Sequence, residues 1–139
     1  TSPLAWFEGP KNPAAAVIEM GMRGFGQIAH LCTAHAPTVG LITNIGHAHL
    51  ELVHTREGIA RAKGELLAAL PADGVAILPA DDDYLDHLRR TAGSRPTLVF
   101  GRAEGADVRL VEARKEGTDL AVAYDVRGRR VEGRLKGPA

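Results

Sequence analysis

The residues with the clearest chemical potential follow an apolar run at positions 39–42. Residues 43–46 (Thr-Asn-Ile-Gly) come directly after this run, and His47, His49 and Glu51 come next. The run is typical of a strand that is buried on both faces of a parallel sheet. Open α/β sheets bind ligands at the carboxyl ends of such strands, and polar groups there are costly to bury without partners. We therefore expect a metal ion or an anionic ligand at this loop; the alternative is a pair of surface histidines.

A carboxylate at the end of a second predicted strand could complete such a site. We expect residues 14–21 to form a buried strand, with Glu19 near its end. If this strand neighbours residues 39–42, Glu19 and His49 lie side by side. A carboxylate and an imidazole can hold a divalent ion that in turn binds a phosphate. Lys63, on the next predicted helix, is either a further member of this site or an ordinary solvated lysine.

Alternating strands and helices must position these residues. The predicted strands are residues 14–21, 39–42, 75–78 and 97–101, and the predicted helices begin near Gly24, Thr55 and Asp81. Thr55 is a plausible N-cap, and Asp81 is expected to cap a helix that runs to about Arg90. This alternation predicts an α/β fold with a mostly parallel sheet flanked by helices. After Gly101 the apolar residues alternate at period two, which predicts a C-terminal antiparallel β-meander with one solvated face at the sheet edge.

Composition bounds the organisation of the chain and its partners. A chain of 139 residues can bury a core. We expect residues 1–13 to be an N-terminal tether, residues 14–101 the α/β core and residues 102–139 the meander of the same domain.

The formal net charge is zero and aromatic residues make up 4%, so no nucleic-acid partner is expected. No apolar segment is long enough to span a membrane and no signal peptide is evident, which predicts a cytoplasmic protein. The single Cys32 excludes an internal disulfide.

Three segments occur together in the order and spacing of a known family. They are Glu19-Met20-Gly21, Thr43-Asn44-Ile45-Gly46-His47-Ala48-His49-Leu50-Glu51 and Glu57-Gly58-Ile59-Ala60-Arg61-Ala62-Lys63-Gly64-Glu65. Through them the chain resembles the central domain of the Mur ligases, strongly over residues 14–101 and more loosely in the meander. Within the family, residues 21–28 favour the member that adds D-alanyl-D-alanine to UDP-N-acetylmuramoyl-tripeptide over its relatives and over folylpolyglutamate synthetase.

The resemblance implies ATP-dependent amide ligation in peptidoglycan synthesis. Such enzymes use ATP to phosphorylate a carboxylate, and an amine then attacks the acyl phosphate. By position, Glu19 and His49 are the implied magnesium ligands, and Lys63 is the implied carbamylated lysine, whose new carboxylate binds a second Mg²⁺. His49 and Lys63 are thus the implied catalytic residues, and Asn44 and Asp81 are implied in ATP binding. The implied ligands are Mg²⁺, ATP as a substrate and, in the full-length enzyme, a UDP-muramoyl peptide.

Three departures from the family pattern bear on activity. The chain contains no G-x-x-G-K-[ST] motif, so the loop that cradles phosphates is missing from it. Pro79 stands where the family has an asparagine that faces adenine, and proline offers neither an amide side chain nor a backbone donor. The chain also ends before the family's Gly-Arg-His-Asn segment and closing domain. We therefore expect a fragment that does not turn over ATP by itself. An exposed parallel edge strand would also allow such a fragment to self-associate.

Two other classes of function remain open from the sequence. His47-Ala48-His49 after a strand resembles the His-x-His motif of metal-dependent hydrolases of the amidohydrolase type. Those sites need further histidines and an aspartate at later strand ends, and His54 and His87 are not expected there. The other class is a non-catalytic module that binds a partner, which would self-associate stably and show no affinity for nucleotides.

Overall fold

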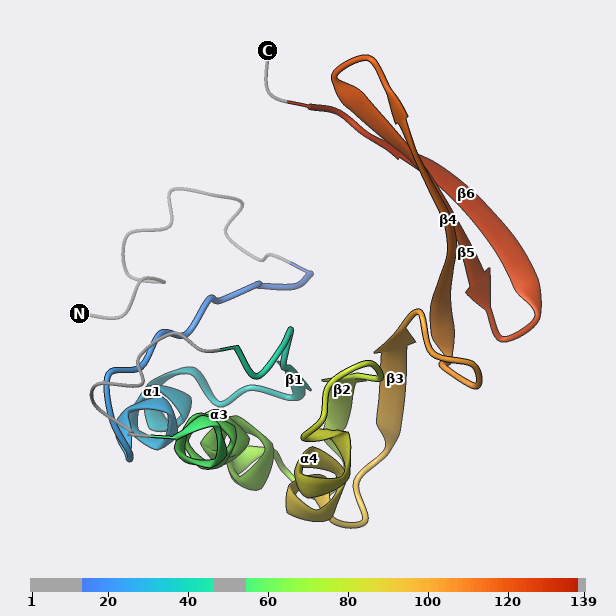
Figure 1. The fold of residues 1–139 in the computed structure, drawn as a ribbon. Helices are drawn as coiled ribbons and strands as arrows, with labels where there is room; N and C mark the ends of the chain where they lie inside the picture. Colours follow the sequence, from blue (N-terminus) through green and yellow to red (C-terminus); the bar gives the residue numbers. More distant parts are fainter. Residues whose placement is uncertain (1–13, 47–54, 138–139) are drawn as a thin grey trace.

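The computed structural model describes residues 14–46 and 55–137. Within these residues helices and strands alternate first, and strands alone follow (Figure 1). The elements are α1 (Gln27–His35), β1 (Val39–Leu41), α3 (Arg56–Ala69), β2 (Val75–Pro79), α4 (Leu85–Ala92), β3 (Thr97–Gly101), β4 (Val108–Glu116), β5 (Asp119–Val126) and β6 (Arg129–Leu135). No helix in the described ranges has the length and apolar character that crossing a bilayer requires.

The strands form one mixed sheet in the order β1-β2-β3-β4-β5-β6. Strands β1 to β4 pair in parallel, and β4 to β6 pair antiparallel. Figure 1 shows α1, α3 and α4 grouped beside β1–β3, while β4–β6 extend away from the helices as a twisted ribbon. The predicted α/β class, with a mostly parallel sheet and an antiparallel end, is therefore confirmed.

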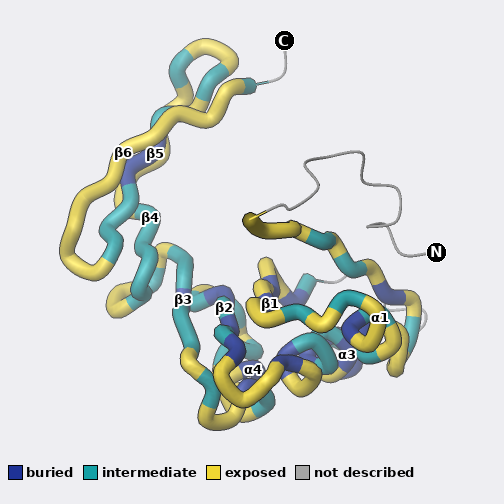
Figure 2. Tube along the Cα trace, turned by 180° about the vertical axis from the view of Figure 1, so that it is seen from behind, coloured by how far each residue is buried: buried dark blue, intermediate teal, exposed yellow. Residues whose placement is uncertain are grey.

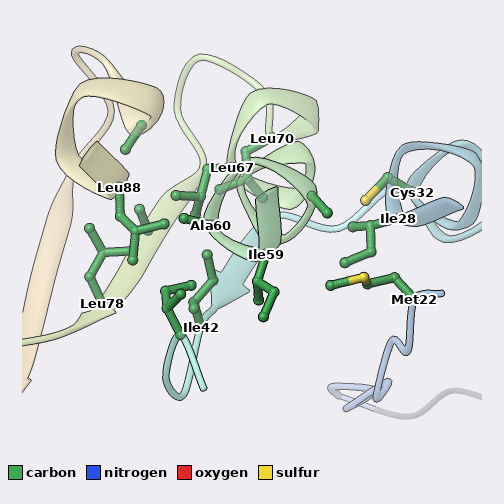
Figure 3. Close-up of a cluster of buried hydrophobic side chains, with 14 of the residues drawn as sticks. Met22, Ile28, Cys32, Ile42, Ile59, Ala60, Leu67, Leu70, Leu78 and Leu88 are labelled. Atoms are coloured by element: carbon green, nitrogen blue, oxygen red, sulfur yellow. The ribbon is translucent and has the colours of Figure 1, made fainter. Parts of the chain in front are cut away.

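The core lies where the helices meet β1–β3. Ile59 and Leu67 of α3, Leu78 of β2 and Leu88 of α4 are all essentially inaccessible to solvent, and Figure 3 shows them in one cluster. At the other end of the cluster, Met22 and two residues of α1 close the core. Buried residues are concentrated in this region in Figure 2, whereas β6 is exposed along its whole length.

Helix α3 is the central helical element of this core, and its position depends on two local features. The predicted N-cap is confirmed, because the Thr55 hydroxyl accepts a hydrogen bond from the Gly58 N–H at 3.0 Å. Gly40 of β1 allows the helix to lie close to the sheet. A Cβ atom at this position would be 3.1 Å from Cγ of Leu66 and 3.2 Å from Cδ1 of Leu70. The first turn of α3 therefore depends on Thr55, and the distance between α3 and the sheet depends on Gly40.

The meander places charged residues on one face. Arg130 contacts Glu112 and Glu132, and Arg134 contacts Glu116 and Asp119. In the β4–β5–β6 register these positions share a face with the small residues of β5. The predicted antiparallel meander is therefore present, but its solvation is not limited to one face, because Val131 and Leu135 on the opposite face of β6 are exposed as well. Such exposed ion pairs contribute little individually to stability.

The predicted strand over residues 14–21 is wrong. These residues form neither a strand nor a helix, and Val17 is fully exposed. A strand needs a neighbour to satisfy its backbone groups, and in the described part of the chain β1 is the outermost strand on this side of the sheet. The expected burial of the strand at residues 39–42 on both faces is also wrong, because Val39 and Leu41 in β1 are about half exposed, at 52% and 51%, while Gly40 between them is buried.

The predicted helix from Asp81 to Arg90 begins later than expected. Helix α4 starts at Leu85, and its N-cap residue is Tyr84. Asp81 does not cap this helix, because its carboxylate accepts hydrogen bonds from the backbone N–H groups of Arg102 and Ala103, both at 2.7 Å. A long-range contact thus replaces the local cap that the sequence pattern suggested.

Candidate functional site at the ends of two parallel strands

The loop after β1 carries the residues that the sequence singled out. Residues 43–46 continue from the strand, with Asn44 exposed and Ile45 only 2% exposed. His47, His49 and Glu51 lie outside the described residues, so the structure does not place them. Glu19 is exposed and lies on the segment that precedes α1. Its predicted proximity to His49 stays a prediction.

Lys63 of α3 points back at this loop. Its Nζ donates a hydrogen bond to the backbone carbonyl oxygen of Asn44 at 2.6 Å. Burial lowers the pKa of the Lys63 ammonium, and the negative charge of Asp82 partly offsets this effect. Among the described residues, Lys63 forms no ion pair with a carboxylate within 4 Å. The lysine is therefore half-buried and directed at the loop, unlike a freely solvated surface lysine.

Two side chains that the sequence analysis did not single out hold the next residue of the loop. The Asp82 carboxylate accepts a hydrogen bond from the Ile45 N–H at 2.6 Å, and Nη2 of Arg56 donates to the Ile45 carbonyl oxygen at 3.2 Å. Asp82 follows β2, and β2 is the parallel neighbour of β1. The sequence offered a signal for Asp82, since it comes just after a predicted strand and close to Pro79, where the family pattern has an asparagine.

Arg56 is itself fixed by neighbours after β2. Its Nη1 donates to the Asp83 carboxylate at 2.8 Å, and its guanidinium lies 5.1 Å from the centre of the Tyr84 ring. The Nε atom of Arg56 is buried without a hydrogen-bond partner in the described residues. Arg56 therefore joins the first turn of α3 to both strand-end loops.

Asp81, predicted to contribute to ATP binding, fastens the loop between β3 and β4. Both of its carboxylate oxygens already accept backbone hydrogen bonds there. The approach is close enough to require glycine at position 101, since a Cβ atom there would be 2.6 Å from Oδ2 of Asp81. Pro79 is buried at the end of β2. A role for Asp81 in nucleotide binding stays a prediction.

Glu65, two residues after Lys63, caps a neighbouring helix. Its carboxylate accepts hydrogen bonds from the N–H groups of Gly26 and Ala29, at 2.6 and 3.1 Å. These groups lie at the start of α1, which has no side-chain cap of its own. Sequence reasoning missed this role because the partners are 39 and 36 residues apart.

The described residues do not by themselves form a metal centre. In residues 14–46 and 55–137, no three His, Cys, Asp or Glu side chains gather closely enough to hold an ion. His87 lies in α4 and not at a strand end, as expected. It therefore does not supply the additional strand-end histidine that the metal-dependent hydrolase reading requires.

Comparison with known proteins agrees with the family resemblance of the three sequence segments. Residues 3–137 match the Mur ligase middle domain. The UDP-N-acetylmuramoyl-tripeptide–D-alanyl-D-alanine ligase of Bacillus subtilis is 37% identical over 122 residues, which are 86% of this chain and 26% of that enzyme. The chain thus spans about a quarter of the length of this relative.

Two solved structures are similar over most of the chain. A crystal structure of MurF from Acinetobacter baumannii superposes with a TM-score of 0.79 at 32% identity, covering 86% of this chain and 26% of that one. A structure of MurF ligase from Thermotoga maritima in complex with ADP superposes with a TM-score of 0.72 at 31% identity, covering 83% and 26%. The arrangement of helices and strands described above is therefore shared with these enzymes.

Proposed function

This chain belongs to the Mur ligase family, and we propose on that basis that it is the ATP-binding part of an enzyme that adds D-alanyl-D-alanine to UDP-N-acetylmuramoyl-tripeptide. The relative from Bacillus subtilis carries the name of that activity. The similar enzyme from Thermotoga maritima binds ADP. The observation that carries the proposal for this chain is the contact of Lys63 with the loop after β1, because it joins parts of two of the three sequence segments that define the resemblance, residues 43–46 and residues 57–65.

The proposed reaction has two steps. The terminal phosphoryl group of ATP is transferred to the tripeptide carboxylate, which releases ADP. The dipeptide amine then attacks the acyl carbon, and phosphate leaves as the amide bond forms. Mg²⁺ would offset the negative charge that accumulates on the phosphoryl oxygens. The task of this chain is to hold that charge and the nucleotide in position.

Lys63 suits carbamylation for a physical reason. Burial lowers the pKa of its ammonium, which increases the fraction of neutral amine at a given pH. The neutral amine is the form that attacks the carbon of carbon dioxide, and one amine proton passes to solvent as the carbamate forms. The carbamate keeps one N–H group, which can still donate to the Asn44 carbonyl.

The residues present fit magnesium only if Lys63 is modified. Mg²⁺ prefers oxygen ligands in an octahedral arrangement. Glu19 supplies a carboxylate, but the ammonium form of Lys63 repels a cation, whereas its carbamate would supply two oxygens. His49, the third proposed ligand, lies outside the described residues.

Calorimetric titration of ATP into the 139-residue chain, with and without Mg²⁺, tests the site. We expect Mg²⁺-dependent binding that weakens in Glu19→Ala, His49→Ala and Lys63→Ala, and that is unchanged in the control Glu104→Ala, which removes an exposed carboxylate from the β3–β4 loop. Binding of equal strength in all four variants would overturn the assignment of the site. Absence of ATP binding in the chain without substitutions would show that these residues do not form a nucleotide site on their own.

Turnover is tested separately. We expect the 139-residue chain not to hydrolyse ATP, because it contains no phosphate-cradling motif. Steady release of ADP that disappears in Lys63→Ala would contradict this expectation. A ¹³C NMR resonance from labelled carbon dioxide, present in the chain without substitutions and lost in Lys63→Arg, would support the carbamate directly. The matched control Lys115→Arg, in exposed strand β4, should keep that resonance.

A further inference from the structure

We propose that Asp82, assisted by Arg56, is a positioning residue that fixes the peptide group between Asn44 and Ile45 and so aims the Asn44 carbonyl at Lys63. The proposal deepens the function proposed above and rests on it for its catalytic meaning. The geometry itself stands on contacts within the described residues. It assigns a role to a side chain outside the three segments on which the family resemblance depends.

Three successive polar atoms of the loop backbone each meet a charged side chain. The Asn44 carbonyl oxygen accepts from Nζ of Lys63 at 2.6 Å. The Ile45 N–H donates to Oδ2 of Asp82 at 2.6 Å. The Ile45 carbonyl oxygen accepts from Nη2 of Arg56 at 3.2 Å. A single peptide group is therefore held at its oxygen by a cation and at its nitrogen by an anion.

The planarity of the peptide bond links these contacts. In a trans peptide the N–H and the C=O point in opposite directions and lie in one plane. When Asp82 fixes the direction of the Ile45 N–H, it also fixes the direction of the Asn44 carbonyl. Because the Ile45 side chain is only 2% exposed, the residue cannot turn away from this arrangement without leaving the core. The position of the Lys63 amine thus depends on a carboxylate that it does not touch.

Asp82 is well placed to act as a rigid support. Its second oxygen, Oδ1, accepts a hydrogen bond from the Tyr84 N–H at 3.0 Å, immediately before α4 begins. Both oxygens are therefore engaged, one by the loop after β1 and the other by the turn after β2. Hydrogen bonds to an ionised carboxylate are shorter and stronger than those between neutral groups. The two strand-end loops should consequently move together.

Amide hydrogen exchange in the 139-residue chain tests the proposal without reference to ATP. In Asp82→Ala we expect the Ile45 amide to exchange about tenfold faster or more, because it loses a charge-assisted acceptor. The amide of Ala76, which donates to the Pro96 carbonyl at 2.9 Å inside the sheet, should be unchanged. Asp82→Asn keeps an acceptor oxygen and should restore most of the protection at Ile45. Asp86→Asn, which removes the same charge from the first turn of α4, is the matched control.

Each outcome bears on the proposal. Unchanged exchange at Ile45 in Asp82→Ala, or an equal increase at Ala76, would overturn it, because the carboxylate would then be dispensable or would support only the fold. If Asp82→Ala does not fold, Asp82→Asn must still shift the Ile45 amide proton upfield, since its acceptor has lost its charge. An unchanged shift would also overturn the proposal.

The ATP titration separates positioning from function. Faster exchange at Ile45 together with no Mg²⁺-dependent ATP binding in any form of the chain would support the positioning role and count against the proposed function. If the chain without substitutions binds ATP with Mg²⁺, we expect Asp82→Ala to bind ATP more weakly and Asp82→Asn to recover part of the affinity. Equal affinity for ATP in all three proteins would show that the positioning of the Asn44–Ile45 peptide group by Asp82 does not contribute to nucleotide binding.

Discussion

Replacing Glu65 with alanine would remove the carboxylate through which α3 caps α1. The N–H groups of Gly26 and Ala29 would lose their acceptor, and α1 has no side-chain cap of its own to replace it. Loss of an N-cap typically costs about 0.5–2 kcal/mol, and loss of a negative charge at a helix N-terminus costs about 0.3–1 kcal/mol. Because Gly26 is exposed and water can replace part of the contact, we expect a loss of about 1–2 kcal/mol in unfolding free energy.

Denaturant and thermal unfolding followed by circular dichroism measure this loss. For a domain of this size we expect the melting temperature to fall by roughly 3–8 °C. Glu65→Gln keeps one acceptor oxygen but no charge and should lose about half as much. Glu104→Ala, at an exposed loop position, should change the free energy of unfolding by less than about 0.5 kcal/mol.

Two results would refute this account of Glu65. A loss below about 0.5 kcal/mol in Glu65→Ala would mean that water replaces the cap without cost. A loss of the same size in Glu65→Gln and Glu65→Ala would mean that the remaining amide oxygen contributes nothing. Added salt provides a further check, since the part of the loss that comes from the helix dipole should shrink as the charge is screened.

Further predictions concern the core, the packing of α3 and the ionisation of two side chains. Leu78→Ala should reduce the free energy of unfolding by about 2–5 kcal/mol, because the side chain is fully buried; a loss below about 1 kcal/mol in denaturant unfolding would contradict the described core. Gly64→Ala should be close to neutral, since the gain in helix propensity is offset by a Cβ that would lie 3.3 Å from Cγ2 of Thr91. In a Thr91→Ser background, which removes that methyl group, the same change should stabilise the protein by about 1 kcal/mol, and an equal effect in both backgrounds would show that the contact is irrelevant. Lys63 has a lowered pKa in the folded state, so the unfolded chain binds more protons between the two pKa values and the penalty is fully present below the folded pKa. The stability of the unmodified protein relative to Lys63→Met should therefore rise as pH increases through the folded pKa toward the unfolded pKa, and a flat difference would count against burial as the cause. Burial, and secondarily the charge of Glu65, raises the pKa of the Cys32 thiol, so the thiolate absorbance should appear at higher pH than in the unfolded chain, and identical titration curves would refute this.

Features set by neighbouring residues could be predicted from the sequence. Thr55 was expected to cap α3, and its hydroxyl does accept a hydrogen bond from Gly58, three residues later. The antiparallel meander was also expected, and Arg127 and Gly128 adopt positive φ angles at its β5–β6 turn. The pattern of apolar residues correctly indicated the strand that ends before residue 43. In each case the determining contacts lie within a few positions of the residue concerned.

Features that depend on distant partners were missed or mistaken. The apolar composition of residues 14–21 favoured a strand, but composition does not supply the hydrogen-bonding neighbour that a strand needs. Asp81 had the sequence context of a helix cap, yet it binds backbone groups more than twenty residues away. The roles of Glu65 and Asp82 likewise depend on partners 36 to 39 residues distant. Periodicity and capping rules contain no information about such contacts.

Three consecutive residues of α3 contact three different parts of the protein. These contacts limit the changes in length that the helix can tolerate in evolution or engineering. Lys63 contacts the loop after β1, Gly64 faces Thr91 of α4, and Glu65 caps α1. Successive residues of a helix point about 100° apart. Inserting or deleting one residue upstream in α3 would therefore turn all three away from their partners at once, whereas insertions in the exposed turns of the meander would leave them in place. Insertions and deletions among functional variants of this chain should accordingly occur mainly in the turns of β4–β6 and not in α3.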